Sequence, residues 1–212
     1  LLGLKMNLIM PDSATAERVK SMEAYGAKVI LTPAEQTIEY SRKVAEEMSE
    51  SGEYFMLNQF GNADNYRAHY KTTGPEIFKD TNGKITHFVS AMGTTGTIMG
   101  VSKYLKEQNP KIEIVGTQPT DGSKIPGIRR WSPEMVPEIF DASRVDTVLD
   151  VSQEEATAMA RRMAKEEGIL AGMSSGGALT AAIKLANKLN SGTIVCITCD
   201  RGDRYLSTDL FK

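Results

Sequence analysis

Glycine and threonine alternate in one short segment, Gly93-Thr94-Thr95-Gly96-Thr97, which follows the apolar run 86–90 and precedes a helical pattern over 98–108. Glycines allow backbone N–H groups to approach a ligand closely, and the threonines add hydroxyl donors. The helix that follows contributes about half a positive charge at its N-terminus. The segment therefore indicates a binding site for an anion, most simply a phosphate. The alternative is a tight strand-to-helix turn in which the glycines serve packing.

The spacing of the glycines narrows the kind of phosphate. A Walker-type loop needs a lysine directly after its last glycine, and no lysine follows Gly96. The dinucleotide fingerprint Gly-x-Gly-x-x-Gly is absent, because the glycines stand at 93, 96 and 100. The monophosphate of a compact cofactor fits the segment better.

A second small-residue segment, Ser174-Ser175-Gly176-Gly177, precedes the helical pattern 177–189. Its serines could bind a ligand, or they could cap that helix.

The elements that must position these segments alternate between strand and helix. Strands are expected at 6–10, 27–31, 54–57, 86–90, 113–117, 147–151 and 193–198, and helices at 13–25, 32–50, 65–80, 98–108, 152–167 and 177–189. Asp12 or Ser13 is expected to cap the first helix, and Ser152 with Glu155 forms a capping box. This alternation predicts an α/β fold with a parallel sheet covered on both faces. Because ligands bind at the carboxyl ends of parallel strands, both small-residue segments are expected at one cleft.

Composition excludes several classes of protein. The 212 residues carry 25 basic and 27 acidic side chains for a net charge of −2, so no nucleic-acid partner is expected. No apolar run is long enough to cross a bilayer. The two cysteines, Cys196 and Cys199, stand at odd spacing on a strand, which argues against a disulfide and suits a reducing cytoplasm. His69 and His87 lack a cluster with metal-ligand spacing, so no metal is expected and both are interpreted as structural.

Several longer stretches resemble one enzyme family. In chain order they are "NYRAHYKTTGPE" (65–76), "GTTGT" (93–97), "KIPGIRRW" (124–131), "AGMSSGG" (171–177) and "CDRGDRYLST" (199–208). Together they resemble the pyridoxal-phosphate enzymes of the cysteine synthase (O-acetylserine sulfhydrylase) family, most of all its B-type, in which "GTTGT" replaces the commoner "GTGGT". The resemblance implies the fold of the type II pyridoxal-phosphate enzymes (tryptophan synthase β-like), with residues 1–61 as a partial small N-terminal domain and 62–212 as the large cofactor-binding domain.

The resemblance also implies roles for individual residues. Gly93, Thr94, Thr95, Gly96 and Thr97 would hold the phosphate of pyridoxal 5'-phosphate, and Ser174 would hydrogen-bond its pyridine nitrogen. A neutral hydroxyl at that nitrogen keeps the ring a weaker electron sink than a carboxylate would. Such a ring suits β-replacement, in which a group leaves the β-carbon of an activated serine and a sulfur nucleophile takes its place, better than transamination.

On the substrate side, Gln59 matches a family loop near the substrate carboxylate. Gly127, Arg129 and Arg130 match a loop at the mouth of the active site, where an arginine could receive a charged sulfur donor such as thiosulfate. Solvated surface charge is the alternative for both arginines. Trp131 is interpreted as a packing residue.

Other features of the family do not match residues of this chain. The lysine that bonds the cofactor and the loop that binds the substrate carboxylate are expected upstream of Leu1, since Lys5, Lys71 and Lys84 lack the required context. The chain is therefore expected to be a fragment without turnover, with Leu1, Leu2 and Leu4 partly stripped of neighbours. By resemblance the parent enzyme is a cytoplasmic homodimer of cysteine biosynthesis. Serine/threonine dehydratases and cystathionine synthases of the same fold remain alternatives, as does a non-catalytic phosphate- or partner-binding module.

Overall fold

The computed structural model describes residues 3–212 and divides them into two compact units. The first unit runs up to Leu57 and includes Asp203–Lys212, and the second unit is Asn58–Gly202. The division differs from the expected boundary after residue 61 in two ways. It lies four residues earlier, and it assigns the last ten residues to the first unit.

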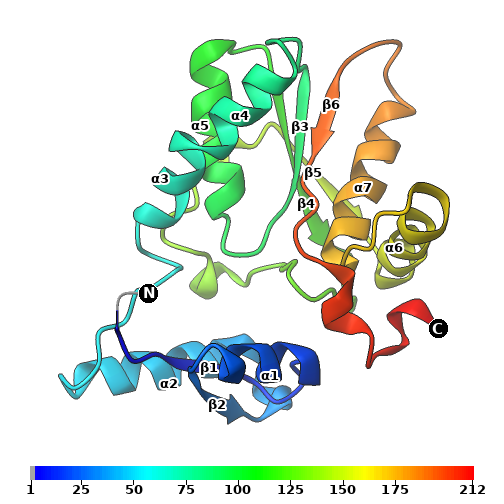
Figure 1. Ribbon diagram of the computed structural model, residues 1–212. Coiled ribbons are helices and arrows are strands. Elements are labelled where there is room, and N and C mark those ends of the chain that lie inside the picture. Colours follow the sequence, from blue (N-terminus) through cyan, green and yellow to red (C-terminus); the bar gives the residue numbers. More distant parts are fainter. Residues whose placement is uncertain (1–2) are drawn as a thin grey trace. The chain divides into compact units, whose positions relative to one another are not determined.

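The second unit is built on a four-stranded sheet in which all strands are parallel (Figure 1). Its strands are β3 (His87–Ala91), β4 (Glu113–Pro119), β5 (Thr147–Val151) and β6 (Ile194–Cys196), in the order β5-β4-β3-β6. The expected parallel α/β fold is confirmed. From β3 the chain moves outward to β4 and β5, and β6 then adds on the other side of β3. Ligands of such sheets bind where the strand order reverses, outside the carboxyl ends of β3 and β6.

Helices cover both faces of this sheet (Figure 1). On one side lie α3 (Asp64–Lys71), α4 (Thr73–Asp80) and α5 (Gly96–Gln108), and on the other lie α6 (Gln153–Glu167) and α7 (Met173–Ala186). Neighbouring strand residues alternate between the two cores that result: Phe88 packs with Ile98 and Leu105, whereas Val89 packs with Ile128 and Ala181. The sheet is thus buried on both sides, as parallel sheets are.

Local signals in the sequence explain where several helices begin. The capping box at α6 is confirmed: Ser152 Oγ accepts from Glu155 N, and the Glu155 carboxylate accepts from Ser152 N. The expected helix 65–80 is two helices that meet at Thr72, with Pro75 in the first turn of α4, where a missing N–H costs nothing.

The first unit pairs two parallel strands, β1 (Asn7–Pro11) and β2 (Lys28–Thr32), with α1 (Ala16–Ala24) and α2 (Thr37–Glu50). Its C-terminal residues join it through long-range contacts: Ser207 N donates to Glu17 Oε1 at 2.8 Å, and Arg18 Nη2 donates to Tyr205 Oη at 3.2 Å.

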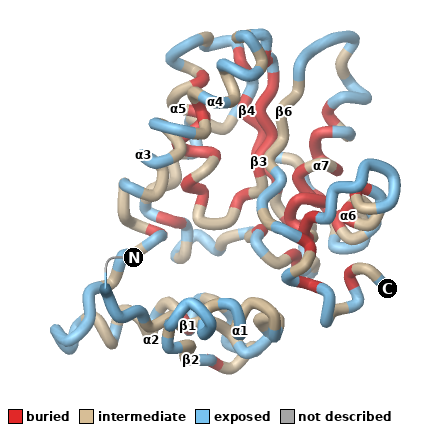
Figure 2. The backbone as a smooth tube through the Cα atoms, in the orientation of Figure 1, coloured by how far each residue is buried: buried red, intermediate tan, exposed pale blue. Residues whose placement is uncertain are grey.

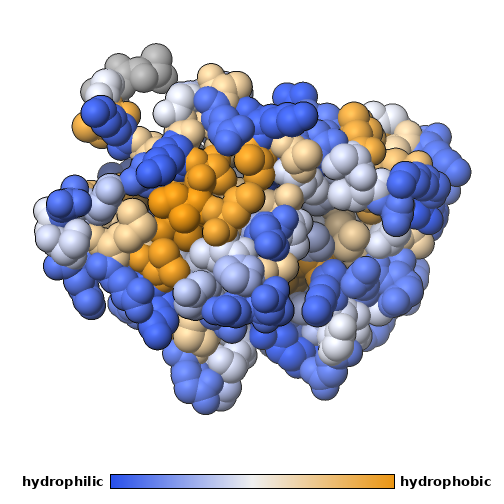
Figure 3. All heavy atoms as spheres, turned by 90° about the horizontal axis from the view of Figure 1, so that it is seen from below, coloured by the Kyte–Doolittle hydropathy of each residue, from blue (hydrophilic) through white to orange (hydrophobic). Residues whose placement is uncertain are grey.

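The described hydrophobic side chains that are buried lie almost entirely in the second unit, as the red segments of Figure 2 show. In the first unit only Tyr205 and Leu210 belong to this group. Leu4, Tyr25, Leu31 and Phe55 of that unit are exposed, and apolar residues gather on the face seen in Figure 3. Leu4 is 79% exposed, as expected, while Leu1 and Leu2 lie outside the described residues.

Two expectations about the first unit were wrong. The first helix begins at Ala16 with Thr15 as its N-cap, and neither Asp12 nor Ser13 caps it; Asp12 Oδ1 instead accepts from Ala34 N, beyond β2. Residues 54–57 do not form a strand. No helix within residues 3–212 has the length and apolar character needed to span a membrane.

Candidate cofactor site

The segment between β3 and α5 combines an unusual backbone with an unpartnered hydroxyl. Thr95 is the N-cap of α5 and has φ 70°, in the left-handed region that a β-branched residue rarely adopts. Its side chain is buried, and Thr95 Oγ1 has no hydrogen-bond partner in the described part of the chain. A buried hydroxyl without a partner costs about 1–3 kcal/mol, and in native proteins such a group often marks a ligand site.

Thr117, at the carboxyl end of β4, repeats this feature next to the loop. Its Oγ1 is buried and likewise lacks a partner among residues 3–212, and its carbonyl accepts from Met92 N at 3.0 Å. The start of α5 adds backbone N–H groups that have no acceptor within the helix. Donors with no protein acceptor therefore gather at the carboxyl ends of β3 and β4.

The other two threonines of the loop are held by α3. Thr94 Oγ1 lies 3.2 Å from Asn65 Nδ2, and Thr97 Oγ1 lies 3.2 Å from His69 Nε2. Asn65 fits against the loop only because residue 96 is a glycine: a Cβ there would lie 1.9 Å from Asn65 Oδ1.

The segment Gly127–Trp131 connects this loop to the start of α7. Arg129 N donates to Met92 O at 2.8 Å, and Trp131 Nε1 donates to Gly93 O at 2.8 Å. Gly127 has φ 90°, and a Cβ on it would lie 3.2 Å from Ser174 Oγ. A Cβ on Gly93 would lie 2.7 Å from Gly127 O. One glycine backbone thus touches both small-residue segments, and the two converge as expected.

Ser174 does not cap α7. The helix begins at Met173 with Gly172 as its N-cap, so Ser174 and Ser175 lie inside its first turn and the capping alternative is wrong. A contact with a segment distant in sequence accompanies this helix start: Gly172 N donates to Asp200 O at 3.1 Å, just after β6. Ser174 is buried, with 2% of its surface exposed, and Ser175 Oγ accepts from Cys199 N.

Cys199 lies beside these serines. Desolvation raises the pKa of its thiol to about 11, although hydrogen bonds from Ser174 and Ser175 act in the opposite direction. Cys199 and Cys196 are both free.

The substrate residues expected from the sequence are distributed around this region. Gln59 is exposed, and its carbonyl accepts from Asn65 Nδ2 at 2.6 Å. Arg129 is half-buried, and its Nη1 lies 3.4 Å from its neighbour's carbonyl, Ile128 O. Trp131 packs edge-on against the buried Phe60, with 5.6 Å between ring centroids, so its interpretation as a packing residue is confirmed.

Arg130 is held by three partners. Its Nη2 lies 2.8 Å from Asp150 Oδ2, its Nε lies 3.2 Å from Asp121 Oδ1, and the same Nε donates to Pro119 O at 3.0 Å. Hydrogen bonds from Gln118 and then Arg130 keep the pKa of Asp150 below its usual range. The guanidinium thus anchors the loop, an arrangement that does not favour the prediction that it receives a substrate anion.

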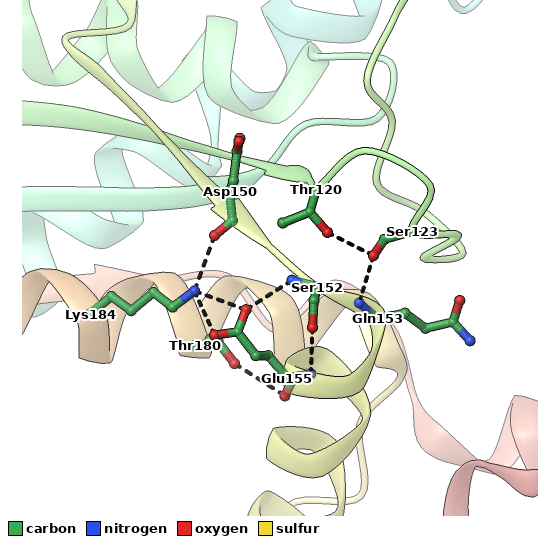
Figure 4. A network of polar contacts seen from close by, with 8 residues as sticks. All are labelled: Thr120, Ser123, Asp150, Ser152, Gln153, Glu155, Thr180 and Lys184. Atoms are coloured by element: carbon green, nitrogen blue, oxygen red, sulfur yellow. Dashed lines mark hydrogen bonds and ion pairs between the residues drawn. The ribbon is translucent and has the colours of Figure 1, made fainter.

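A polar network links the same loop to α6, and α6 to α7 (Figure 4). Ser123 Oγ lies 2.8 Å from Thr120 Oγ1 and accepts from Gln153 N at 3.1 Å. Lys184 Nζ lies 2.7 Å from Glu155 Oε1 and donates to Asp150 O. The loop that presents Gly127 to Ser174 is therefore fixed at its base by the start of α6.

Sequence reasoning missed Asn65 and overlooked what His69 does. Their spacing of four residues on a predicted helix was a usable signal, because it places both on one face. Lys71 and Lys84 are exposed, and Lys84 precedes the amino end of β3, at the edge opposite the loop. No group of three His, Cys, Asp or Glu side chains suited to a metal occurs in the described ranges.

The residues present fit a compact phosphorylated cofactor. The unpartnered Thr95 hydroxyl and the helix start suit a phosphate, and the buried hydroxyl of Ser174 can meet a ring nitrogen without bringing a charge. Gly93 of the first segment and Ser174 both lie close to Gly127.

Comparisons with known proteins show which family the chain resembles. Residues 1–200 match the family model described as "Pyridoxal-phosphate dependent enzyme". The chain is 57% identical over 209 residues to cysteine synthase B of Pseudomonas aeruginosa, covering 99% of this chain and 70% of that protein. Cysteine synthase B of Escherichia coli is 54% identical over 211 residues, again covering 70% of its length. A crystal structure of cysteine synthase from Entamoeba histolytica superimposes with a TM-score of 0.88 at 36% identity, covering 99% of this chain and 65% of that one.

Proposed function

The chain belongs to the family of pyridoxal-phosphate-dependent enzymes, and on that premise we propose that it acts in cysteine synthesis by β-replacement. The substrates are O-acetylserine and sulfide, which give L-cysteine, or O-acetylserine and thiosulfate, which give S-sulfocysteine. The single observation that carries the proposal is the convergence of the loop 93–97 and Ser174 on Gly127.

The cofactor is pyridoxal 5'-phosphate, which when bound withdraws electrons from the substrate and so eases loss of the β-substituent. In the proposal, Gly93, Thr94, Thr95, Gly96 and Thr97 hold its phosphate through hydroxyl and backbone N–H donors. Ser174 holds its ring nitrogen with a neutral hydroxyl. Burial of Ser174 supports this role, because a desolvated hydroxyl binds a neutral nitrogen more strongly than an exposed one does.

We assign the substrate side to Gln59, Gly127 and Arg129. Arg130, the other arginine predicted to meet a charged sulfur donor, has two carboxylate partners, which does not favour that role. The role assigned to Gly127 is to keep the space beside Ser174 open, since a side chain at this position would approach Ser174 Oγ.

A chimera tests the proposal directly. This chain replaces the aligned segment of the Pseudomonas aeruginosa enzyme, whose remaining 30% supplies whatever the aligned segment lacks. The chimera is expected to make cysteine from O-acetylserine and sulfide, and a Ser174→Ala version is expected to lose most of that activity.

Two outcomes would contradict the proposal. Release of ammonia and a keto acid from serine or threonine, without cysteine formation, would indicate a dehydratase. A folded chimera that binds no pyridoxal 5'-phosphate would indicate a binding module that only shares the scaffold.

We also propose that the protein works as a homodimer in the cytoplasm. The resemblance to the family supports both statements, and the two free cysteines suit a reducing compartment. Light scattering of the purified protein measures the oligomeric state.

A further inference from the structure

Helix α3 presents two polar side chains to the start of α5. Asn65 and His69 are four residues apart and therefore lie on one face of α3. Asn65 lies against Thr94 and His69 against Thr97, so one helix face contacts two of the three hydroxyls of the loop.

The orientation of the Asn65 amide follows from its other partner. Its Nδ2 lies 2.6 Å from Gln59 O, and a carbonyl can only accept, so this atom is the nitrogen. The same nitrogen donates to Thr94 Oγ1 at 3.2 Å, and Gly96 N donates to that oxygen at 3.4 Å. Thr94 thus receives two hydrogen bonds and keeps its own proton for another partner.

The tautomer of His69 follows from the threonines at the other side of the ring. Thr72 Oγ1 donates to Ala68 O at 2.8 Å, so its proton is already used. Thr73 Oγ1 lies 2.9 Å from His69 Nδ1 and 3.5 Å from Thr72 Oγ1, and the shorter contact takes its proton. Nδ1 is then an acceptor and the ring proton is on Nε2, which donates to Thr97 Oγ1. Burial lowers the pKa of His69, in keeping with a neutral ring.

We propose that Asn65 and His69 are positioning residues that donate to Thr94 and Thr97 and so leave both threonine protons directed to the bound phosphate. The inference rests on the proposed function, which supplies the phosphate. A hydroxyl has one proton, so a threonine that donated to α3 would turn lone pairs toward the anion and weaken its binding. Helix α3 thereby makes donors of two groups that could otherwise face the anion as acceptors.

Nitrogen-15 NMR of the chain tests the tautomer without any ligand. The sequence has only two histidines, so in a His87→Gln variant every imidazole signal comes from His69. We expect a protonated Nε2 and an unprotonated Nδ1 at neutral pH. The opposite tautomer would overturn the role assigned to His69.

A double-mutant cycle tests the route of action. The readout is the dissociation constant of pyridoxal 5'-phosphate, compared with that of pyridoxal, which lacks the phosphate. Both His69→Leu and Thr97→Val are expected to weaken binding of the phosphorylated form by about tenfold and to leave pyridoxal unchanged. In the Thr97→Val background, His69→Leu is expected to cause no further loss of affinity, because the hydroxyl through which His69 acts is already absent.

Two further variants separate positioning from general damage to the fold. His69→Gln restores an N–H near the position of Nε2 and is expected to bind close to wild type. Tyr70→Phe removes a hydrogen bond from the same helix to Glu107 and is expected to leave the affinity unchanged.

The outcomes distinguish this inference from the proposed function. Additive losses in the cycle, or a His69→Gln variant of normal thermal stability that behaves like His69→Leu, would overturn the inference alone. A wild-type chain that binds pyridoxal 5'-phosphate no better than pyridoxal would overturn the proposed function, and the inference with it.

Discussion

At the scale of single residues, Thr95 combines two unfavourable features at one position. A non-glycine residue in the left-handed region costs about 1–2 kcal/mol, and its hydroxyl is buried without a partner in the described structure. Backbone strain of this kind collects at ligand sites, where it is offset when the ligand is bound. The commoner family sequence "GTGGT" has glycine here, which removes the strain together with the hydroxyl.

Thr95→Gly is expected to raise the free energy of unfolding by about 1 kcal/mol and to weaken binding of pyridoxal 5'-phosphate. Urea unfolding and a cofactor titration measure the two effects. Thr95→Ala serves as the control, because it removes the hydroxyl and keeps the strain, so only its affinity should match the glycine variant. A less stable glycine variant would contradict the strain argument.

Cys199 is exposed as a residue, yet desolvation of its thiol raises the pKa from 9.0 to about 11, so slow reaction with iodoacetamide at pH 8 is expected. The folded state holds the proton more tightly than the unfolded state does. Its contribution to stability is therefore complete below about pH 9 and is lost as the pH rises through about 11. Alkylation rates of a Cys196→Ser variant from pH 7.5 to 11 isolate this thiol, and a rate that levels off near pH 9 would refute the shift.

At the scale of elements, the irregular loop after β4 is positioned by its anchors. Arg130 binds Asp150 of β5, and Ser123 binds the first residue of α6. These contacts hold Gly127 between Gly93 and Ser174, so the geometry of the site depends on elements that carry none of its ligand-binding residues.

Arg130→Gln is expected to loosen this loop with a loss of stability of at most about 1 kcal/mol, because the ion pairs are partly exposed. Trypsin should then cut after the exposed Lys124 faster than in wild type. Arg162→Gln, which loses only an ion pair to Glu166 along α6, is the matched control. Unchanged cleavage after Lys124 would show that other contacts suffice.

Much of this arrangement follows from the sequence. The alternation of strands and helices correctly predicted the parallel sheet, and the pair Ser152 and Glu155 correctly predicted where α6 begins. Local signals gave wrong helix starts where a residue distant in sequence supplies the hydrogen-bond partner. Asp12 accepts from Ala34 N instead of capping α1. Gly172 N donates to Asp200 O, and α7 begins before the two serines that could have capped it. The site shows the same limit, since the donors that reach Thr94 and Thr97 come from residues 29 and 28 positions away.

At the scale of the whole molecule, the two units differ in what stabilises them. The second unit holds nearly all the described buried hydrophobic residues, whereas β1 and β2 form an isolated pair of strands. Two-stranded sheets are marginal in water without extensive packing.

Hydrogen exchange is therefore expected to be fast in β1, β2 and α2 and slowest in β3, β4 and α5. Mass spectrometry of peptides from the native chain measures the difference. Equal protection in both units would mean that the first unit is stabilised by contacts other than buried hydrophobic side chains.

The attachment of residues 203–212 to the first unit affects the order of events during synthesis. Glu17 cannot meet Ser207, nor Arg18 meet Tyr205, until about 190 further residues have left the ribosome. All four strands of the second unit, from β3 to β6, precede Tyr205 and Ser207 in the chain. The contacts that tie residues 203–212 to α1 can therefore form only after the strands of the second unit have been synthesised.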